Sequence, residues 1–242
     1  MTRPGALLAL WNGVADGFPL DEYEDWHAFE HVPERVGLPG FVEARRYRHR
    51  HAGGTRYFTC YWLESLQALD TPGYRDLLAN PTPWSARMRA ALTDFVRLPC
   101  VLDGIDGCAT APLVVPVVTA GAVAQPAGAL DAACAQLVRE AAVACVQRAT
   151  VRSGEKHPLD KSGAAPASGR LLVVQGADRG RLDGAVRALA RLAPWSDGTG
   201  SAPAVFELVT IVRQQDLQHP LGARQPPRPD LFRRYQSPGD PP

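Results

Sequence analysis

The 242-residue sequence lacks the features that mark several large classes of protein. No apolar run approaches the roughly 20 residues of a membrane-spanning helix, and residues 1–12 lack the cationic head, apolar stretch and cleavage site of a secretory signal. Lysine and arginine number 26 against 25 acidic residues, so no surplus positive charge exists to hold a polyanion. We therefore expect a cytoplasmic protein that binds neither nucleic acid nor a membrane.

Common nucleotide and hydrolase motifs are also absent. The sequence contains no G-x-x-x-x-G-K-[ST], no G-x-G-x-x-G and no G-x-S-x-G, which excludes the usual phosphate loops and the serine nucleophile turn. The five cysteines are scattered, odd in number and never form a C-x-x-C pair. We interpret them as reduced thiols, most of which fill space in the core.

The first hundred residues alternate between strand-like and helical stretches in the order β-α-β-β-α-β. Two strand-like runs, 41–51 and 55–63, are separated by AGG, where glycine supplies the positive φ angles of a hairpin, so they should pair antiparallel. This order is the split βαβ pattern of ferredoxin-like folds. The expected elements are a strand at 5–13, a helix at 21–35, strands at 41–51 and 55–63, helices at 66–79 and 84–93, and a strand at 95–102.

The rest of the chain repeats this order more faintly. FVEARRYR at 41–48 aligns with CVQRATVR at 145–152, which supports an internal repeat. We therefore predict an α+β protein of two ferredoxin-like βαββαβ halves, residues 1–107 and 108–218, with a proline-rich tail at 219–242. The second-half elements are expected at 113–118, 129–142, 145–152, 170–176, 182–192 and 205–213, with a flexible surface loop at 153–169.

Three segments of the first half carry a family resemblance. They are WHAFEHVPERVGLPGFVEARRYR at 26–48, TRYFTCYWLESLQAL at 55–69 and NPTPWSARM at 80–88. Through them the chain resembles bacterial EthD-like members of the dimeric α/β-barrel superfamily. The resemblance implies two sheets packed face to face as a barrel, here within one chain, with a small-molecule pocket between each sheet and its helices. It also implies one polar site, because the second half has no matching histidines.

His27, Glu30 and His31 form the motif H-x-x-E-H on the predicted helix at 21–35. Histidines four residues apart share a helix face, and the motif matches the inverted zinc-protease pattern. The short helix, the nearby Pro33 and the small size of the chain disfavour such a protease. No third metal ligand stands at a diagnostic spacing, so we assign neither a metal nor a cofactor.

The interpretation we favour makes His31 a general acid or base, because imidazole takes and returns protons near neutral pH. Glu30 or His27 would orient it, and the resemblance directs the Glu-His pair toward the pocket. In the alternative interpretation His27 is exposed, Glu30 pairs with Arg35 or Arg45, and His31 packs at the helix end.

Side chains on the two central strands are candidates for binding substrate. By the period-two alternation of strands, Arg45, Tyr47 and His49 share one face, and Tyr57, Thr59 and Tyr61 share a face of the next strand. In the alternative, these residues form a solvated strand face and ordinary sheet packing. The substrate-binding candidates are Arg45, Tyr47, Tyr57, Tyr61 and Trp26.

These expectations point to a small-molecule enzyme. We expect cofactor-independent proton transfer of the isomerase, cyclase or lyase type, or monooxygenation, on a hydrophobic or aromatic compound. The alternative is a ligand-binding or stress-response barrel without catalysis. The chain is expected to be a monomer by intrachain pairing of its halves, or a homodimer.

Overall fold

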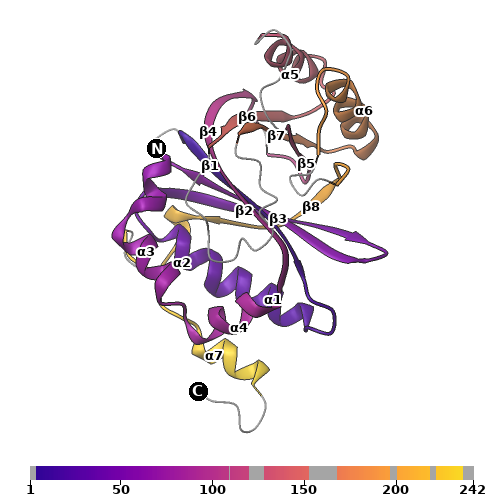
Figure 1. The fold of residues 1–242 in the computed structure, drawn as a ribbon. Coiled ribbons are helices and arrows are strands. Elements are labelled where there is room, and N and C mark those ends of the chain that lie inside the picture. The colour runs from indigo at the N-terminus through magenta and orange to yellow at the C-terminus, as the bar shows by residue number, and fades with distance from the viewer. Residues whose placement is uncertain are drawn as a thin grey trace.

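The strands of this computed structural model close into one barrel, described over residues 4–108, 110–119, 128–152, 168–196, 201–218 and 222–236 (Figure 1). All neighbouring strands are antiparallel, in the order β1-β3-β2-β8-β5-β7-β6-β4. The strands are β1 (Ala6–Val14), β2 (Phe41–His51), β3 (Gly54–Leu63), β4 (Leu92–Gly107), β5 (Leu113–Val118), β6 (Cys145–Val151), β7 (Gly169–Gly176) and β8 (Phe206–Arg213).

Helices cover two opposite sides of this barrel (Figure 1). The elements run β-α-β-β-α-β from β1 to β4, and in the same order from β5 to β8, which agrees with the order expected from hydrophobic periodicity. The helices are α1 (Leu20–Trp26), the π-helical turn η1 (His27–His31), α2 (Val32–Val36), η2 (Leu66–Asp70), α3 (Pro72–Ala79), α4 (Pro83–Ala91), α5 (Ala129–Arg139), α6 (Arg179–Ala190), η3 (Gln214–Asp216), α7 (Pro229–Phe232) and η4 (Arg233–Tyr235).

The core has three main layers set by strand alternation. Inward side chains such as Ala9 and Trp11 fill the barrel lumen, while Leu8 faces the helices outside. α1 to α4 cover the outer face of the first four strands, and α5 and α6 pack on the outer face of the second four. All five cysteines are free, and all but Cys108 are buried, as the prediction of core thiols requires.

Several expected elements differ in the structure. The strand expected at 95–102 extends over Leu92–Gly107 as β4, and the helix expected at 129–142 ends at Arg139. The helix expected at 66–79 divides into η2 and α3, because the Thr71 hydroxyl caps a new helix that begins at Pro72. The tail forms α7 and η4, because Leu231 and Phe232 find an apolar surface to pack on. Residues 153–167 of the expected loop lie outside the described residues. Among the described residues, no helix is long and apolar enough to cross a bilayer.

Candidate active site

A small cavity lies between the first helical segment and the outer face of the first four strands. Its volume of about 40 Å³ leaves room for water or a ligand of a few heavy atoms. Aromatic and aliphatic side chains supply much of its wall, and its polar groups come from both the helix and the sheet. The lining residues are Leu8, Leu10, Asn12, Tyr23, Trp26, His27, His31, Arg35, Thr59, Tyr74, Leu92, Phe95 and Arg97.

The helical side of the cavity presents Tyr23, His27 and His31, which are spaced four residues apart. The turn from His27 to His31 is π-helical, a local widening common at functional sites. The two imidazoles stack with ring centroids 5.1 Å apart, and the Trp26 ring lies 4.1 Å from that of His31. The Trp26 indole N–H donates to Ser85 Oγ at 3.1 Å, so the aromatic wall is fixed from behind.

The sheet side of the cavity is one row of side chains across four strands. Strand register pairs Leu10 with Arg97 on one side and with Thr59 on the other, and Thr59 with Arg46. Directly paired residues of antiparallel strands project from the same face. Arg97 and Thr59 therefore line the cavity from below, and Arg46 lies beside it.

Burial keeps both histidines neutral. It lowers the pKa of His27 and of His31 well below the usual value near 6.5, and the positive charge of Arg35 lowers both further. His27 is 4% exposed, which overturns the alternative of a surface histidine. The Nδ1 atom of each ring is buried without a hydrogen-bond partner in the described part of the chain. The cavity therefore presents two imidazoles able to accept or donate a proton.

Arg46 is a deeply buried charge beside the site, at 1% exposed. It pairs with Glu24, and its guanidinium lies 4.3 Å from the Tyr57 ring and 4.9 Å from the Tyr23 ring. Glu24 also accepts hydrogen bonds from Tyr57 Oη and Arg48. Burial alone would raise the pKa of Glu24, but Arg46 and these hydrogen bonds hold it below its usual value.

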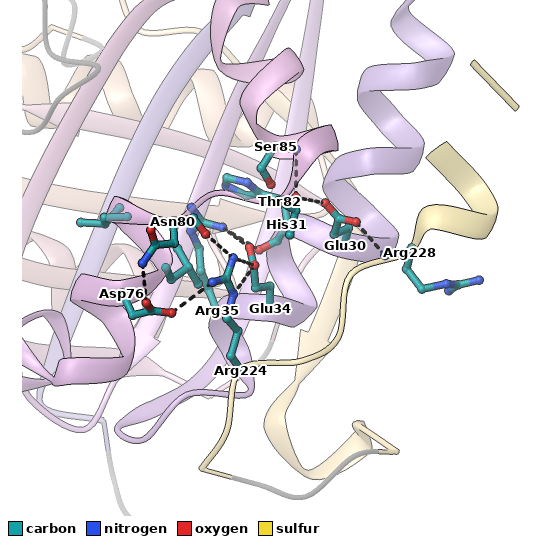
Figure 2. A network of polar contacts seen from close by, with 12 residues as sticks. Glu30, His31, Glu34, Arg35, Asp76, Asn80, Thr82, Ser85, Arg224 and Arg228 are labelled. Carbon is teal, nitrogen blue, oxygen red and sulfur yellow. Dashed lines mark hydrogen bonds and ion pairs between the residues drawn. The ribbon is translucent and has the colours of Figure 1, made fainter. Parts of the chain in front are cut away.

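Glu30 points away from the cavity. It accepts hydrogen bonds from the Thr82 hydroxyl and from the backbone N–H of Arg228, the latter at 2.7 Å (Figure 2). It pairs with neither Arg35 nor Arg45, the partners considered from sequence, and it borders a separate groove of about 390 Å³ under the C-terminal segment. Glu30 thus orients neither imidazole directly, and the described residues include no group of three side chains placed to hold a metal ion.

Glu34 anchors the C-terminal segment one turn further along the helix. Its carboxylate is 2% exposed and lies 2.6 Å from Arg224 Nη2 and 3.5 Å from Arg35 Nη1. Arg224 also donates to the carboxylate of Asp76 in α3 and to the backbone carbonyl of Asn80, the residue that follows α3 (Figure 2). The segment at 222–236 is therefore attached to the layer of helices that carries the histidines.

The structure separates the predicted substrate-binding residues onto two faces of the sheet. Arg45 and Tyr47 point into the barrel lumen, where Arg45 pairs with Glu43 and lies 5.0 Å over the Trp62 ring, while Tyr47 stacks on Phe58. These two residues do not reach the cavity, because the register places the intervening residue of β2 opposite Thr59.

Trp26, Tyr57 and Tyr61 are on the helix-facing side. Trp26 lines the cavity directly. Tyr57 lies beside it, where its hydroxyl donates to Glu24 and its ring packs under the Arg46 guanidinium. The Tyr61 hydroxyl is buried with no hydrogen-bond partner among the described residues, and this ring packs against Phe41. Sequence reasoning did not propose Tyr23, Arg35 or Arg97, which line the cavity, or Arg46 beside it. Arg46 and Arg97 reach this face through the pairing of β2 and β4 with their neighbouring strands, which a single strand does not reveal.

Comparison with known proteins identifies the fold. No family model and no curated protein matches the sequence. An anthrone oxidase-like protein is similar in structure, with a TM-score of 0.56 and 9% identity over 89% of this chain and 96% of its own. This likeness shows a shared fold, a mixed α/β protein with a closed eight-stranded antiparallel barrel.

Two further structures, both named as candidate monooxygenases, match at lower TM-scores. The one from Fusobacterium nucleatum has a TM-score of 0.49 and 9% identity over 87% of this chain and 95% of its own. The one from Lactobacillus acidophilus has a TM-score of 0.47 and 12% identity, over 87% and 97%.

Proposed function

We propose that this chain is a small-molecule enzyme of EthD-like type, in which His31 moves a proton on a hydrophobic or aromatic compound without a cofactor. The observation that carries the proposal is a pair of neutral imidazoles whose Nδ1 atoms have no hydrogen-bond partner among the described residues, at a cavity lined by Trp26, Leu92 and Phe95. A buried polar atom with no partner is costly unless a ligand or water completes it.

In this mechanism neutral His31 accepts a proton from a C–H or O–H group of the substrate. The imidazole gains positive charge, and the substrate oxygen that takes up the negative charge lies in the field of Arg35 and Arg97, both of which line the cavity. The His27 ring stacks on the His31 ring, and the Trp26 ring packs against both imidazoles. Glu30 is a positioning residue that fixes the helix through Thr82.

The same first step leads to several outcomes. Return of the proton to another carbon is isomerisation, and reaction of the electron-rich carbanion with dioxygen is cofactor-independent oxygenation. We include oxygenation because the similar structure is named anthrone oxidase-like. A substrate of aromatic size needs more room than about 40 Å³, so half-buried Leu92 and Phe95 must move to admit it.

We further propose that residues 1–107 and 108–218 are two ferredoxin-like halves fused in tandem. The repeated element order and the strand orders β4-β1-β3-β2 and β8-β5-β7-β6 support this. The layer between α5, α6 and the second four strands is packed with aliphatic side chains, so the second half serves as a structural partner.

A binding protein without catalysis is the second candidate. The small volume of the cavity favours it, because a ligand of a few heavy atoms fits without any rearrangement. Such a barrel would use the same groups to recognise the ligand and release it unchanged.

Deuterium exchange separates the two candidates. The protein is incubated anaerobically in D₂O with anthrone and with simple aryl ketones, and incorporation of deuterium next to the carbonyl is followed by NMR. We expect catalysed exchange that falls by about 100-fold or more in His31→Ala, whereas His49→Ala, in a strand-end histidine that bonds the Val205 carbonyl, retains it. Exchange that survives in His31→Ala, or binding of these compounds without exchange, would contradict the proposal.

A further inference from the structure

We propose that the ligand of this cavity binds as an anion, with an ionised carboxylate or phenolate oxygen held by Arg97 and Thr59. This rests on the proposed function only in placing the ligand in the same cavity. An anion can bind in this way whether or not it is turned over.

Arg97 is a cation without an anionic partner in the described part of the chain. It is half-buried, lines the cavity, and its Nε is buried without a hydrogen-bond partner. The other arginines near the cavity have partners: Arg46 pairs with Glu24, Arg35 lies by Glu34, and Arg89 donates to backbone carbonyls. Arg46 keeps two buried nitrogens without a hydrogen bond among the described residues, but its charge is balanced by Glu24. A half-buried guanidinium pairs favourably with a carboxylate or another anionic oxygen, so an anionic ligand would supply the partner that Arg97 lacks.

The remaining polar groups of the cavity also favour an anionic ligand. The Thr59 hydroxyl is 1% exposed and has no partner among the described residues, and it lies in the same cross-strand row as Arg97, separated from it by Leu10. The lining includes two arginines and no aspartate or glutamate. A neutral imidazole can also donate its N–H. The cavity therefore offers donors and positive charge and presents no carboxylate that would repel an anion.

The apolar side chains of the cavity indicate that the rest of the ligand is apolar. Trp26, Leu92 and Phe95 line the same cavity as Arg97, so an anionic oxygen at Arg97 leaves the body of the ligand against these side chains. A compact molecule with one ionised oxygen on an aromatic or short aliphatic body fits both the guanidinium of Arg97 and the apolar wall. A carboxylate or phenolate suits the planar, multiple donors of a guanidinium.

Benzoate and benzamide form a matched pair of probes, because they have nearly the same shape and differ in charge. Their binding to the intact protein is measured by isothermal titration calorimetry, with acetate as a smaller anion. We expect benzoate or acetate to bind and benzamide to bind at least about tenfold more weakly. The His27 and His31 ring signals should shift in NMR on addition of the anion, which locates it at this cavity.

Variants of Arg97 test the contact itself. Arg97→Met keeps an unbranched apolar stem and should weaken anion binding at least about tenfold, and Arg97→Lys should restore part of it. Arg139→Met removes an exposed arginine from α5 and should leave binding unchanged. Equal affinity for benzoate and benzamide, no binding of either anion, or full binding by a folded Arg97→Met protein would overturn the inference.

The two proposals fail separately. Anion binding that depends on Arg97, together with no deuterium exchange on any ketone, would overturn the proposed catalysis and support the anion site. Exchange on neutral ketones that depends on His31 and is not inhibited by benzoate would overturn the anion site and support the catalysis.

Discussion

Single residues at this site derive their chemistry from burial. His27 and His31 lie at neighbouring turns of one helix face, where burial and the positive charges of Arg35 and Arg46 act on both rings. Each of these conditions favours the neutral ring. A histidine that stays neutral at neutral pH can act as a base without first losing a proton. Once it accepts a proton from the substrate, its positive charge is stabilised by the negative charge left on the substrate.

The same burial makes folding depend on pH. The folded pKa of both histidines lies well below 6.5, whereas in the unfolded chain it is about 6.5. As the pH falls below about 6.5, the unfolded chain takes up protons that the folded chain refuses, so stability is lost on the acidic side. The loss approaches about 1.4 kcal/mol per pH unit for each histidine, until its folded pKa is reached.

Urea unfolding at pH 7.5, 6.5 and 5.5 measures this dependence. The double variant His27→Gln/His31→Gln should lose less free energy of unfolding between pH 6.5 and 5.5 than the native chain. The variant His49→Gln serves as the control. An unchanged pH slope in the double variant would mean that these histidines titrate normally in the folded protein.

The residues of the site could be predicted only in part. H-x-x-E-H predicted a site on the helix that the structure places against the cavity, whose lining includes both histidines and Trp26. The alternation along β2 and β3 was also correct for each strand alone. Because β2 pairs Arg46 with Thr59, Arg45 was placed on the wrong side of the sheet for this pocket. Register between strands depends on contacts across the barrel, which periodicity within one strand does not contain.

At the scale of elements, the C-terminal segment at 222–236 holds the histidine helix from outside. Arg224 reaches Glu34, the backbone of Arg228 reaches Glu30, and Tyr235 Oη donates to Asp25 at 2.7 Å. These three acids lie along α1 to α2 on the side away from the cavity. The sequence predicted a proline-rich tail at 219–242 but not these polar contacts, because proline-rich composition does not specify which surface the segment meets.

Removal of the Arg224 side chain tests this attachment. Arg224→Met leaves the 2% exposed Glu34 with only the longer contact to Arg35, and a buried charge that loses its partner is destabilising. We expect the free energy of unfolding to fall by about 2 kcal/mol. It is measured by urea denaturation at pH 7.5.

The double variant Glu34→Gln/Arg224→Met is the control for the pair. It should recover much of the lost stability, because no buried charge remains unpaired. If Arg224→Met were as stable as the native chain, the contact seen between Arg224 and Glu34 would contribute nothing to holding the segment.

At the scale of the whole molecule, the barrel closes through two strand pairs that join its halves, called seams below. β2 pairs with β8 and β4 pairs with β6, so that none of the eight described strands has a free edge. The order of elements in each half could be read from hydrophobic periodicity. Periodicity could not predict that both halves close into one barrel, because closure pairs β4 with β6, about 50 residues apart, and β2 with β8, about 160 residues apart. Only the family resemblance suggested it.

Separation of the halves tests the role of these seams. A fragment of residues 1–107 loses β6 and β8 and exposes the edges of β2 and β4, and unpaired edges associate. We expect this fragment to self-associate in size-exclusion chromatography with light scattering, and the intact chain to be a monomer. A stable monomeric fragment would contradict the need for the second half.

The pH profile of His31-dependent deuterium exchange tests the central claim most directly. The measured quantity is the difference in exchange rate on a neutral aryl ketone between the native chain and His31→Ala, from pH 8 to pH 4.5. Because burial and Arg35 hold the pKa of His31 well below 6.5, we predict a rate that stays level through pH 6.5 and falls only at lower pH. A rate that is half lost near pH 6.5, or that does not depend on His31, would contradict a neutral buried histidine as the base.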